Sequence, residues 1–287
     1  MRVFTLVRYP DQLEGRWKGF KLGDNFVQSS LALVRQFRRN LYQLMDHEPD
    51  HPDASWSFHL PPTFTESYNI YGLSKVVIPY GTVANGYTYN PKLPAYWNLG
   101  RIGFLMARQV MHNFDETGIS YSSSILRDYH NETAFGKDLN LQLLRQRIEN
   151  YNSELSWVDP RVIIPPIRSR SIVNQAYAET TGLELSWLTY QEKKRQNRNP
   201  EEFWPLPLLN MTDAQLFFLA TAQMYCTDRA LSTEAYAFGV GERLPDRLRV
   251  YSLTANSAQF EEAFNCPAKS SQLRDQSLTE KKVNIKG

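Results

Sequence analysis

The residues of this sequence that could do chemistry centre on His112. Residues 106–115 read Met-Ala-Arg-Gln-Val-Met-His-Asn-Phe-Asp. A helix that binds Zn²⁺ for hydrolysis reads His-Glu-x-x-His, because imidazoles at i and i+4 share one face and the Glu serves as general base. Here Arg108 stands at the first ligand position, Gln109 at the base and His112 at the second ligand. Taken alone, this segment therefore predicts an ordinary helix that carries one histidine.

Composition is typical of a globular protein and excludes little. The chain has 287 residues, of which 42% are hydrophobic and 22% charged, enough for one large domain or two close-packed ones. The formal net charge of +2 gives no reason to expect nucleic acid or a membrane surface as partner. The first residues lack the apolar stretch of a signal peptide, and no apolar run is long enough to span a bilayer.

The elements that must position these side chains are mostly helical. Residues 25–45 carry apolar side chains at three-and-four spacing, which predicts a helix with one buried stripe. Thr212 and Gln215 form a capping-box pattern at the start of another helix. The β-branched run 75–83 predicts a strand that ends in a turn. Further helices are predicted at 94–115, 139–151 and 171–198, and a short extended segment at 162–166.

Several other segments recur in the order that a known family shows. They are Glu66-Ser67-Tyr68-Asn69, residues 76–81 (Val-Val-Ile-Pro-Tyr-Gly), 98–103 (Asn-Leu-Gly-Arg-Ile-Gly), 215–218 (Gln-Leu-Phe-Phe), 222–226 (Ala-Gln-Met-Tyr-Cys), 243–250 and 263–266. With the helix at His112, they resemble the catalytic half of the neprilysin and endothelin-converting enzyme family, the M13 zinc metallopeptidases. The resemblance runs from about Tyr9 to Cys266.

The resemblance implies a fold and a domain organisation. The fold class it implies is α+β and mainly α, a thermolysin-like (zincin, gluzincin) metallopeptidase domain with a small sheet. We expect residues 1–267 to form this M13 peptidase-like domain. Residues 268–287 are polar, which predicts a disordered tail.

The resemblance also assigns positions in a zinc site. The metal ligands of the family fall on Arg108, His112 and Gln175. The general base falls on Gln109, and the histidine that stabilises the oxyanion falls on Arg243. Glu179 takes the place of an aspartate that holds a zinc-bound histidine.

Substrate-binding positions follow in the same way. Glu66 and Ser67 replace an Asn and an Ala that bind the substrate backbone in the family, while Arg249 keeps the arginine that grips substrate carbonyls. Arg108, at a ligand position, and Arg243, at the oxyanion position, would favour ligands with acidic groups or C-terminal carboxylates. The alternative is that Arg249 only stabilises the fold, and the two interpretations stand level.

These replacements predict a catalytically inactive homologue that has lost zinc and that acts, if at all, as a peptide-binding or regulatory protein. Groups that hydrolysis requires are replaced by the guanidinium groups of Arg108 and Arg243 and by the amides of Gln109 and Gln175. One alternative is an active zinc metalloendopeptidase whose ligands come from His130 or from the histidines of 47–59. Another is a vestigial fragment without a function of its own.

Arg108 itself has two possible environments. Loss of a metal would leave buried carboxylates uncompensated, so we expect Arg108 to pair with Glu179 or Asp115. Extension of its side chain into solvent is the alternative. For His112, a hydrogen-bonded core histidine is favoured over a lone zinc ligand.

The two cysteines bear on where the protein works. Cys226 and Cys266 cannot form a disulfide framework, which taken alone favours a reducing compartment or a chain that is not whole. In the family that the sequence resembles, the matching cysteines pair with an N-terminal region, so we expect a half-length or truncated relative. The family suggests the plasma membrane or the extracellular space, whereas no signal or anchor is visible, and the location stays open.

Overall fold

The computed structural model describes part of the chain. The described residues are 19–21, 23–43, 63–73, 75–121, 170–196, 203–204, 209–229, 233 and 244–266. The helix predicted at 139–151, the segment 162–166, the tail 268–287, Arg243 and every histidine except His112 lie outside them. The chain divides into two compact units, residues 1–60 and 61–287, and the assignment of 1–267 to one domain stays a prediction.

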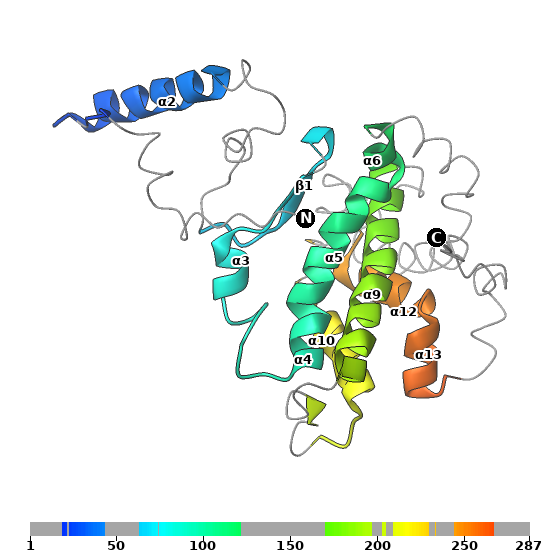
Figure 1. Ribbon diagram of the computed structural model, residues 1–287. Helices are drawn as coiled ribbons and strands as arrows, with labels where there is room; N and C mark the ends of the chain where they lie inside the picture. The colour runs from blue at the N-terminus through cyan, green and yellow to red at the C-terminus, as the bar shows by residue number, and fades with distance from the viewer. Residues whose placement is uncertain are drawn as a thin grey trace. The chain divides into compact units, whose positions relative to one another are not determined.

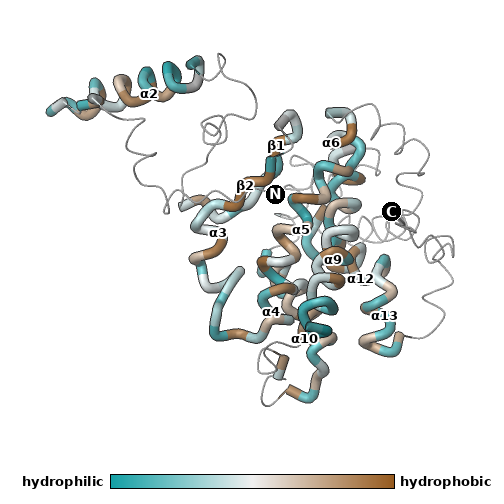
Figure 2. The backbone as a smooth tube through the Cα atoms, viewed as in Figure 1, coloured by the Kyte–Doolittle hydropathy of each residue, from teal (hydrophilic) through white to brown (hydrophobic). Residues whose placement is uncertain are grey.

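The first unit contributes one long helix. Helix α2 spans Phe26–Gln43, and the side chain of Asn25 accepts a hydrogen bond from the backbone N–H of Gln28 at its start. The predicted helix is confirmed, but the prediction that its apolar stripe is buried is wrong, since Phe26 is 83% exposed. Hydrophobic and hydrophilic residues alternate along α2 (Figure 2). Within residues 1–60 the structure describes no second helix or strand that could cover this stripe.

The second unit is built on two antiparallel helices, which lie side by side in Figure 1. The first is part of a continuous helical run that confirms the helix predicted at 94–115. The run consists of α4 (Ala95–Asn98), a π-helical turn η5 (Leu99–Gly103), α5 (Phe104–Met111) and a 3₁₀ turn η6 (His112–Phe114). Asp115 ends this run and caps the next helix, α6 (Glu116–Ser120).

The partner helix is α9, which spans Arg170–Gln196 and confirms the helix predicted at 171–198. It packs against α5 at very short range around Gly182. A Cβ atom at Gly182 would lie 2.7 Å from the Cα atom of Arg108, closer than real Cβ contacts. The absence of a side chain at this glycine therefore sets how closely the two helices approach.

Three shorter helices close the core. They are α10 (Asp213–Gln223), α12 (Asp246–Ala255) and α13 (Ala258–Phe264). Thr212 and Gln215 form both hydrogen bonds of the capping box, which confirms that prediction. Buried aromatic side chains fill the space between α4, α5, α9 and α10. Prominent among them are Tyr96, Phe104, Trp187, Phe217 and Phe218.

A two-stranded antiparallel sheet lies next to α5. Strand β1 (Tyr68–Ile70) pairs with β2 (Lys75–Val77) across the turn η4 (Tyr71–Leu73). The predicted strand 75–83 ends early because Pro79, which cannot donate a ladder hydrogen bond, precedes helix α3 (Tyr80–Ala84). The described residues are thus mainly helical with a small sheet, as predicted, and none of their helices has the length and hydropathy to cross a bilayer.

Candidate functional site

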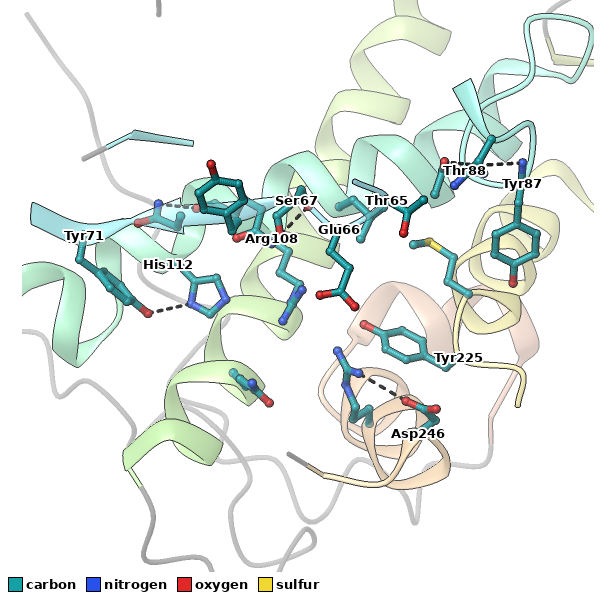
Figure 3. Close-up of a pocket in the computed structure, with 18 residues that line it drawn as sticks. Thr65, Glu66, Ser67, Tyr71, Tyr87, Thr88, Arg108, His112, Tyr225 and Asp246 are labelled. Carbon is teal, nitrogen blue, oxygen red and sulfur yellow. Dashed lines mark hydrogen bonds and ion pairs between the residues drawn. The ribbon is translucent and has the colours of Figure 1, made fainter. Parts of the chain in front are cut away.

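A cavity of about 460 Å³ brings the predicted positions together. Its walls come from the segment that leads into β1, from α5 and η6, and from α9 and α12 (Figure 3). Seven residues singled out from the sequence line it: Glu66, Ser67, Arg108, Gln109, His112, Gln175 and Arg249. Glu179 lies behind the wall in contact with Arg249, and Arg243 is outside the described residues.

The charged part of the site is centred on the buried carboxylate of Glu179. Arg249 donates hydrogen bonds to Glu179 Oε1 from Nε, at 2.9 Å, and from Nη2. Arg108 Nε lies 3.4 Å from the same oxygen, which confirms the predicted pairing of Arg108 with Glu179. This contact is an ion pair without hydrogen-bond geometry, because Arg108 Nε has no hydrogen-bond partner among the described residues. One carboxylate therefore serves two guanidinium groups.

The electrostatics of this cluster hold Glu179 ionised. Burial alone would raise the pKa of Glu179. The charges of Arg249 and Arg108, together with the hydrogen bonds from Arg249, outweigh burial and lower the pKa of Glu179 below its ordinary value of about 4.5. A negative charge on Glu179 is thus the state that the two arginines stabilise.

A second buried carboxylate, Asp115, holds His112. Asp115 Oδ2 accepts from the Tyr71 hydroxyl at 2.8 Å and lies 2.9 Å from His112 Nδ1, while Oδ1 accepts from the backbone N–H of Gly118 at 2.7 Å. Burial and then the hydrogen bond to Asp115 raise the pKa of Tyr71, which keeps its proton. His112 is 8% exposed and is a hydrogen-bonded core histidine. It also lines the cavity, and its hydrogen bonds to described residues all involve Nδ1, not Nε2.

Gln109 is held by the backbone next to β1. Its amide Nε2 donates to Ser67 O at 2.9 Å and lies 3.2 Å from Ser67 Oγ. Asn69 Nδ2 in turn donates to Gln109 O at 2.9 Å. These hydrogen bonds tie the small sheet to α5 and hold the Gln109 amide through its nitrogen, and an amide lacks the basicity to accept a proton from water.

The structure adds three residues that sequence reasoning missed. Tyr71 positions Asp115, Asp246 Oδ1 lies 3.4 Å from Arg249 Nη1, and the Arg249 guanidinium stacks 4.4 Å above the ring of Tyr225. Asp246 was within reach of sequence reasoning, because it precedes Arg249 by three positions on one helix. Tyr225 lies in the segment 222–226 that the family resemblance covers, but nothing there marks its contact with Arg249, and nothing in the sequence marks Tyr71.

Metal-ligating chemistry is sparse around the cavity. In the part of the chain that the structure describes, no three His, Cys, Asp or Glu side chains are grouped so that they could hold a metal ion. Both cysteines are free: Cys226 is exposed and Cys266 is partly exposed. The described walls carry the imidazole of His112, the carboxylates of Glu66 and Asp246 and the neutral amide of Gln175.

The helical fold with its small sheet is that of a thermolysin-like metallopeptidase domain. The same fold occurs in the zinc metalloprotease Zmp1 of Mycobacterium tuberculosis, with a TM-score of 0.59, 20% identity and coverage of 88% of this chain and 35% of that one. It also occurs in PepO of Lactobacillus rhamnosis, with a TM-score of 0.54, 14% identity, and coverage of 92% and 36%. Residues 67–279 match the sequence model of peptidase family M13, and the chain belongs to this family.

Relatives by sequence agree with this membership. Endothelin-converting enzyme 1 of Cavia porcellus is 27% identical over 212 residues, which cover 74% of this chain and 26% of that enzyme. An endothelin-converting enzyme homologue of Locusta migratoria is 25% identical over 265 residues, which cover 90% of this chain and 34% of the relative. The chain thus spans about a quarter to a third of the length of these relatives.

Proposed function

We propose that this M13 family chain binds peptides in the cavity between α5 and α12 and does not hydrolyse them through zinc. The observation that carries the proposal is the ion pair of Arg108 with Glu179, at 3.4 Å. A fixed cation thereby stands where the family resemblance puts the first zinc ligand. A peptide ligand is supported by family membership and by the size of the cavity, about 460 Å³, which is typical of ligand sites.

The residues around the cavity do not fit a zinc ion. Catalytic Zn²⁺ takes three imidazole, thiolate or carboxylate ligands and keeps one open position. Here His112 is the one imidazole on the described walls, and Gln175 offers a neutral amide oxygen, a weak ligand. The two buried carboxylates of the site are already held by other groups, Glu179 by two guanidinium groups and Asp115 by Tyr71, His112 and Gly118. A dication next to Arg108 would also be repelled.

The residue at the position of the family's general base does not suit proton transfer either. A general base has to accept a proton from water in the transition state. Gln109 at that position carries an amide without the required basicity, and both contacts of its nitrogen go to Ser67. Loss of the metal and loss of the base act on the same step, so hydrolysis fails even where one of them is replaced.

Metal content and turnover of the purified chain test the proposal. We expect zinc far below one ion per chain, no peptide cleavage that a chelator abolishes, and saturable binding of a short-peptide library. Stoichiometric zinc together with chelator-sensitive cleavage would overturn it and would direct attention to His130 or to the histidines of residues 47–59, which lie outside the described residues.

A matched gain-of-metal variant sharpens the test. Combining Arg108→His, Gln109→Glu and Gln175→Glu gives each position the residue type of a zinc site. We expect this variant to bind zinc where the original chain does not, with metal content as the readout. Equal zinc content in both proteins would contradict the view that these three side chains exclude the metal.

A further inference from the structure

Two arginines line the cavity, and they differ in how far their hydrogen bonds are satisfied. Each nitrogen of Arg249 makes a hydrogen bond, since Nε and Nη2 donate to Glu179 and Nη1 donates to Asp246, and the guanidinium stacks on Tyr225. Arg108 has the ion pair with Glu179 alone, and none of its nitrogens donates a hydrogen bond to a described residue. The arginine that the family resemblance marks for substrate is therefore held by hydrogen bonds, while the one at the lost metal position has an ion pair and no hydrogen-bond acceptor among the described residues.

The donors of Arg108 are only partly satisfied by the described residues. A guanidinium carries five N–H donors and keeps its charge at any ordinary pH. The Arg108 side chain is only 14% exposed, and its Nε is buried without an acceptor. The ion pair with Glu179 involves Nε, so the Nη groups at the end of the side chain remain for a ligand, and in this mostly buried setting an acceptor there gains more than on an open surface.

The position of Arg108 defines what kind of acceptor fits. In Figure 3 its guanidinium end points into the cavity, between the ring of His112 and the carboxylate of Glu66. The planar fork of a guanidinium matches the two oxygens of a carboxylate. Glu66 and Asp246 also line the cavity, and their carboxylates disfavour anions of higher charge such as a phosphate.

We infer that Arg108 anchors a carboxylate of the bound ligand, and that this residue rather than Arg249 sets the preference for acidic ligands. The inference rests on the proposed peptide-binding function, because it names the group that the same cavity recognises. A carboxylate can come from the C-terminus of a peptide or from an acidic side chain, and both present the same chemistry to Arg108.

Calorimetric or fluorescence titration of the full chain with matched ligands tests the inference. Three N-acetylated tripeptides are compared. The first has neutral side chains and a free C-terminus, the second is the same peptide with an amidated C-terminus, and the third is the amidated peptide with one side chain replaced by that of glutamate. Benzoate and benzamide form a further matched pair without peptide bonds. We expect ligands with a carboxylate to bind at least about 10-fold more tightly than their neutral partners.

Variants connect this preference to the named residue. Arg108→Gln should weaken carboxylate ligands by about 10- to 100-fold and leave the neutral ligands unchanged. Arg247→Gln is the matched control, since Arg247 is exposed on α12 and does not line the cavity. Should Arg108→Gln fail to fold, Glu66→Gln serves instead, because removing an exposed negative charge from the wall should tighten carboxylate ligands roughly 2- to 5-fold.

The outcomes separate this inference from the proposed function. Equal binding of acidic and neutral tripeptides overturns the carboxylate anchor and leaves peptide binding intact. Binding of benzoate over benzamide that disappears in Arg108→Gln, with no tripeptide bound, supports the anchor and overturns the peptide ligand. No binding in any arm overturns both, and a preference that survives in Arg108→Gln shows that another residue holds the carboxylate.

Discussion

The two buried carboxylates of the site, Asp115 and Glu179, are stabilised in opposite ways. Asp115 is fully buried and is satisfied by three hydrogen-bonding groups, from Tyr71, His112 and Gly118. Glu179 is 2% exposed and is satisfied by two guanidinium groups, with no neutral hydrogen-bond donor among its described partners. In the first cluster Tyr71 and His112 can exchange donor and acceptor roles, whereas the second consists of fixed charges.

This contrast shows where the site can adapt. A tyrosine hydroxyl and an imidazole can each donate or accept, so the Asp115 cluster can rearrange its protons without moving heavy atoms. An arginine only donates and stays charged, so the Glu179 cluster depends on the carboxylate remaining ionised. We expect the two clusters to respond very differently to removal of their central charge.

The largest effect is expected for Glu179→Gln. Its loss leaves Arg249 with Asp246 alone and leaves Arg108 without an anion, and breaking a buried ion pair by removing one partner costs about 3–5 kcal/mol. Urea unfolding measures the change in the free energy of unfolding. The control is Glu192→Gln on the same helix, where an exposed ion pair with Arg195 is lost and little change is expected. Comparable losses in both variants would contradict the charge-dependent view of Glu179.

The dependence on pH sharpens the same contrast. The folded-state pKa of Glu179 is lowered, so its contribution to stability is fully present above its ordinary pKa of about 4.5 and is lost as the pH falls through the lowered value. The free energy of unfolding of the original chain should therefore decrease through this acidic range more steeply than that of Glu179→Gln. Urea titrations at several pH values measure both slopes, and parallel curves would show that Glu179 is not held ionised by its arginines.

A smaller loss is expected for Asp115→Asn. The asparagine oxygen can still accept from Gly118, and its amide can donate to a Tyr71 hydroxyl or a His112 Nδ1 that turns into an acceptor. The cost is therefore about 1–2 kcal/mol. Nitrogen NMR of the imidazole should show the proton of His112 moving from Nδ1 to Nε2. A loss as large as that of Glu179→Gln would show that Asp115 also acts through its charge.

Sequence reasoning reached the helices and the membership of the site better than its internal partners. Periodicity and the capping box were sufficient for α5, α9 and α10, because these depend on local spacing. The order of the segments was sufficient to group residues as distant as Ser67 and Arg249 around one cavity. The hydrogen bonds from Arg249 to Glu179 and Asp246 were not predicted, since they depend on how α9 and α12 pack. The exposure of α2 was missed for a similar reason, because periodicity shows that a face is apolar and not what covers it.

The smallest effect, and the finest test of the Asp115 cluster, is expected for Tyr71→Phe. The change removes the hydroxyl that donates to Asp115 Oδ2 at 2.8 Å and leaves that oxygen with His112 alone. A loss of about 0.5–1.5 kcal/mol in the free energy of unfolding follows, since one neutral hydrogen bond is removed and the other partners remain. Tyr121→Phe is the matched control, because the exposed Tyr121 ring stacks on Tyr71 at 6.3 Å and its hydroxyl makes no hydrogen bond to a described residue. If both variants lose the same amount, the Tyr71 hydroxyl adds nothing to the Asp115 cluster, and the imidazole and the backbone of Gly118 hold that carboxylate by themselves.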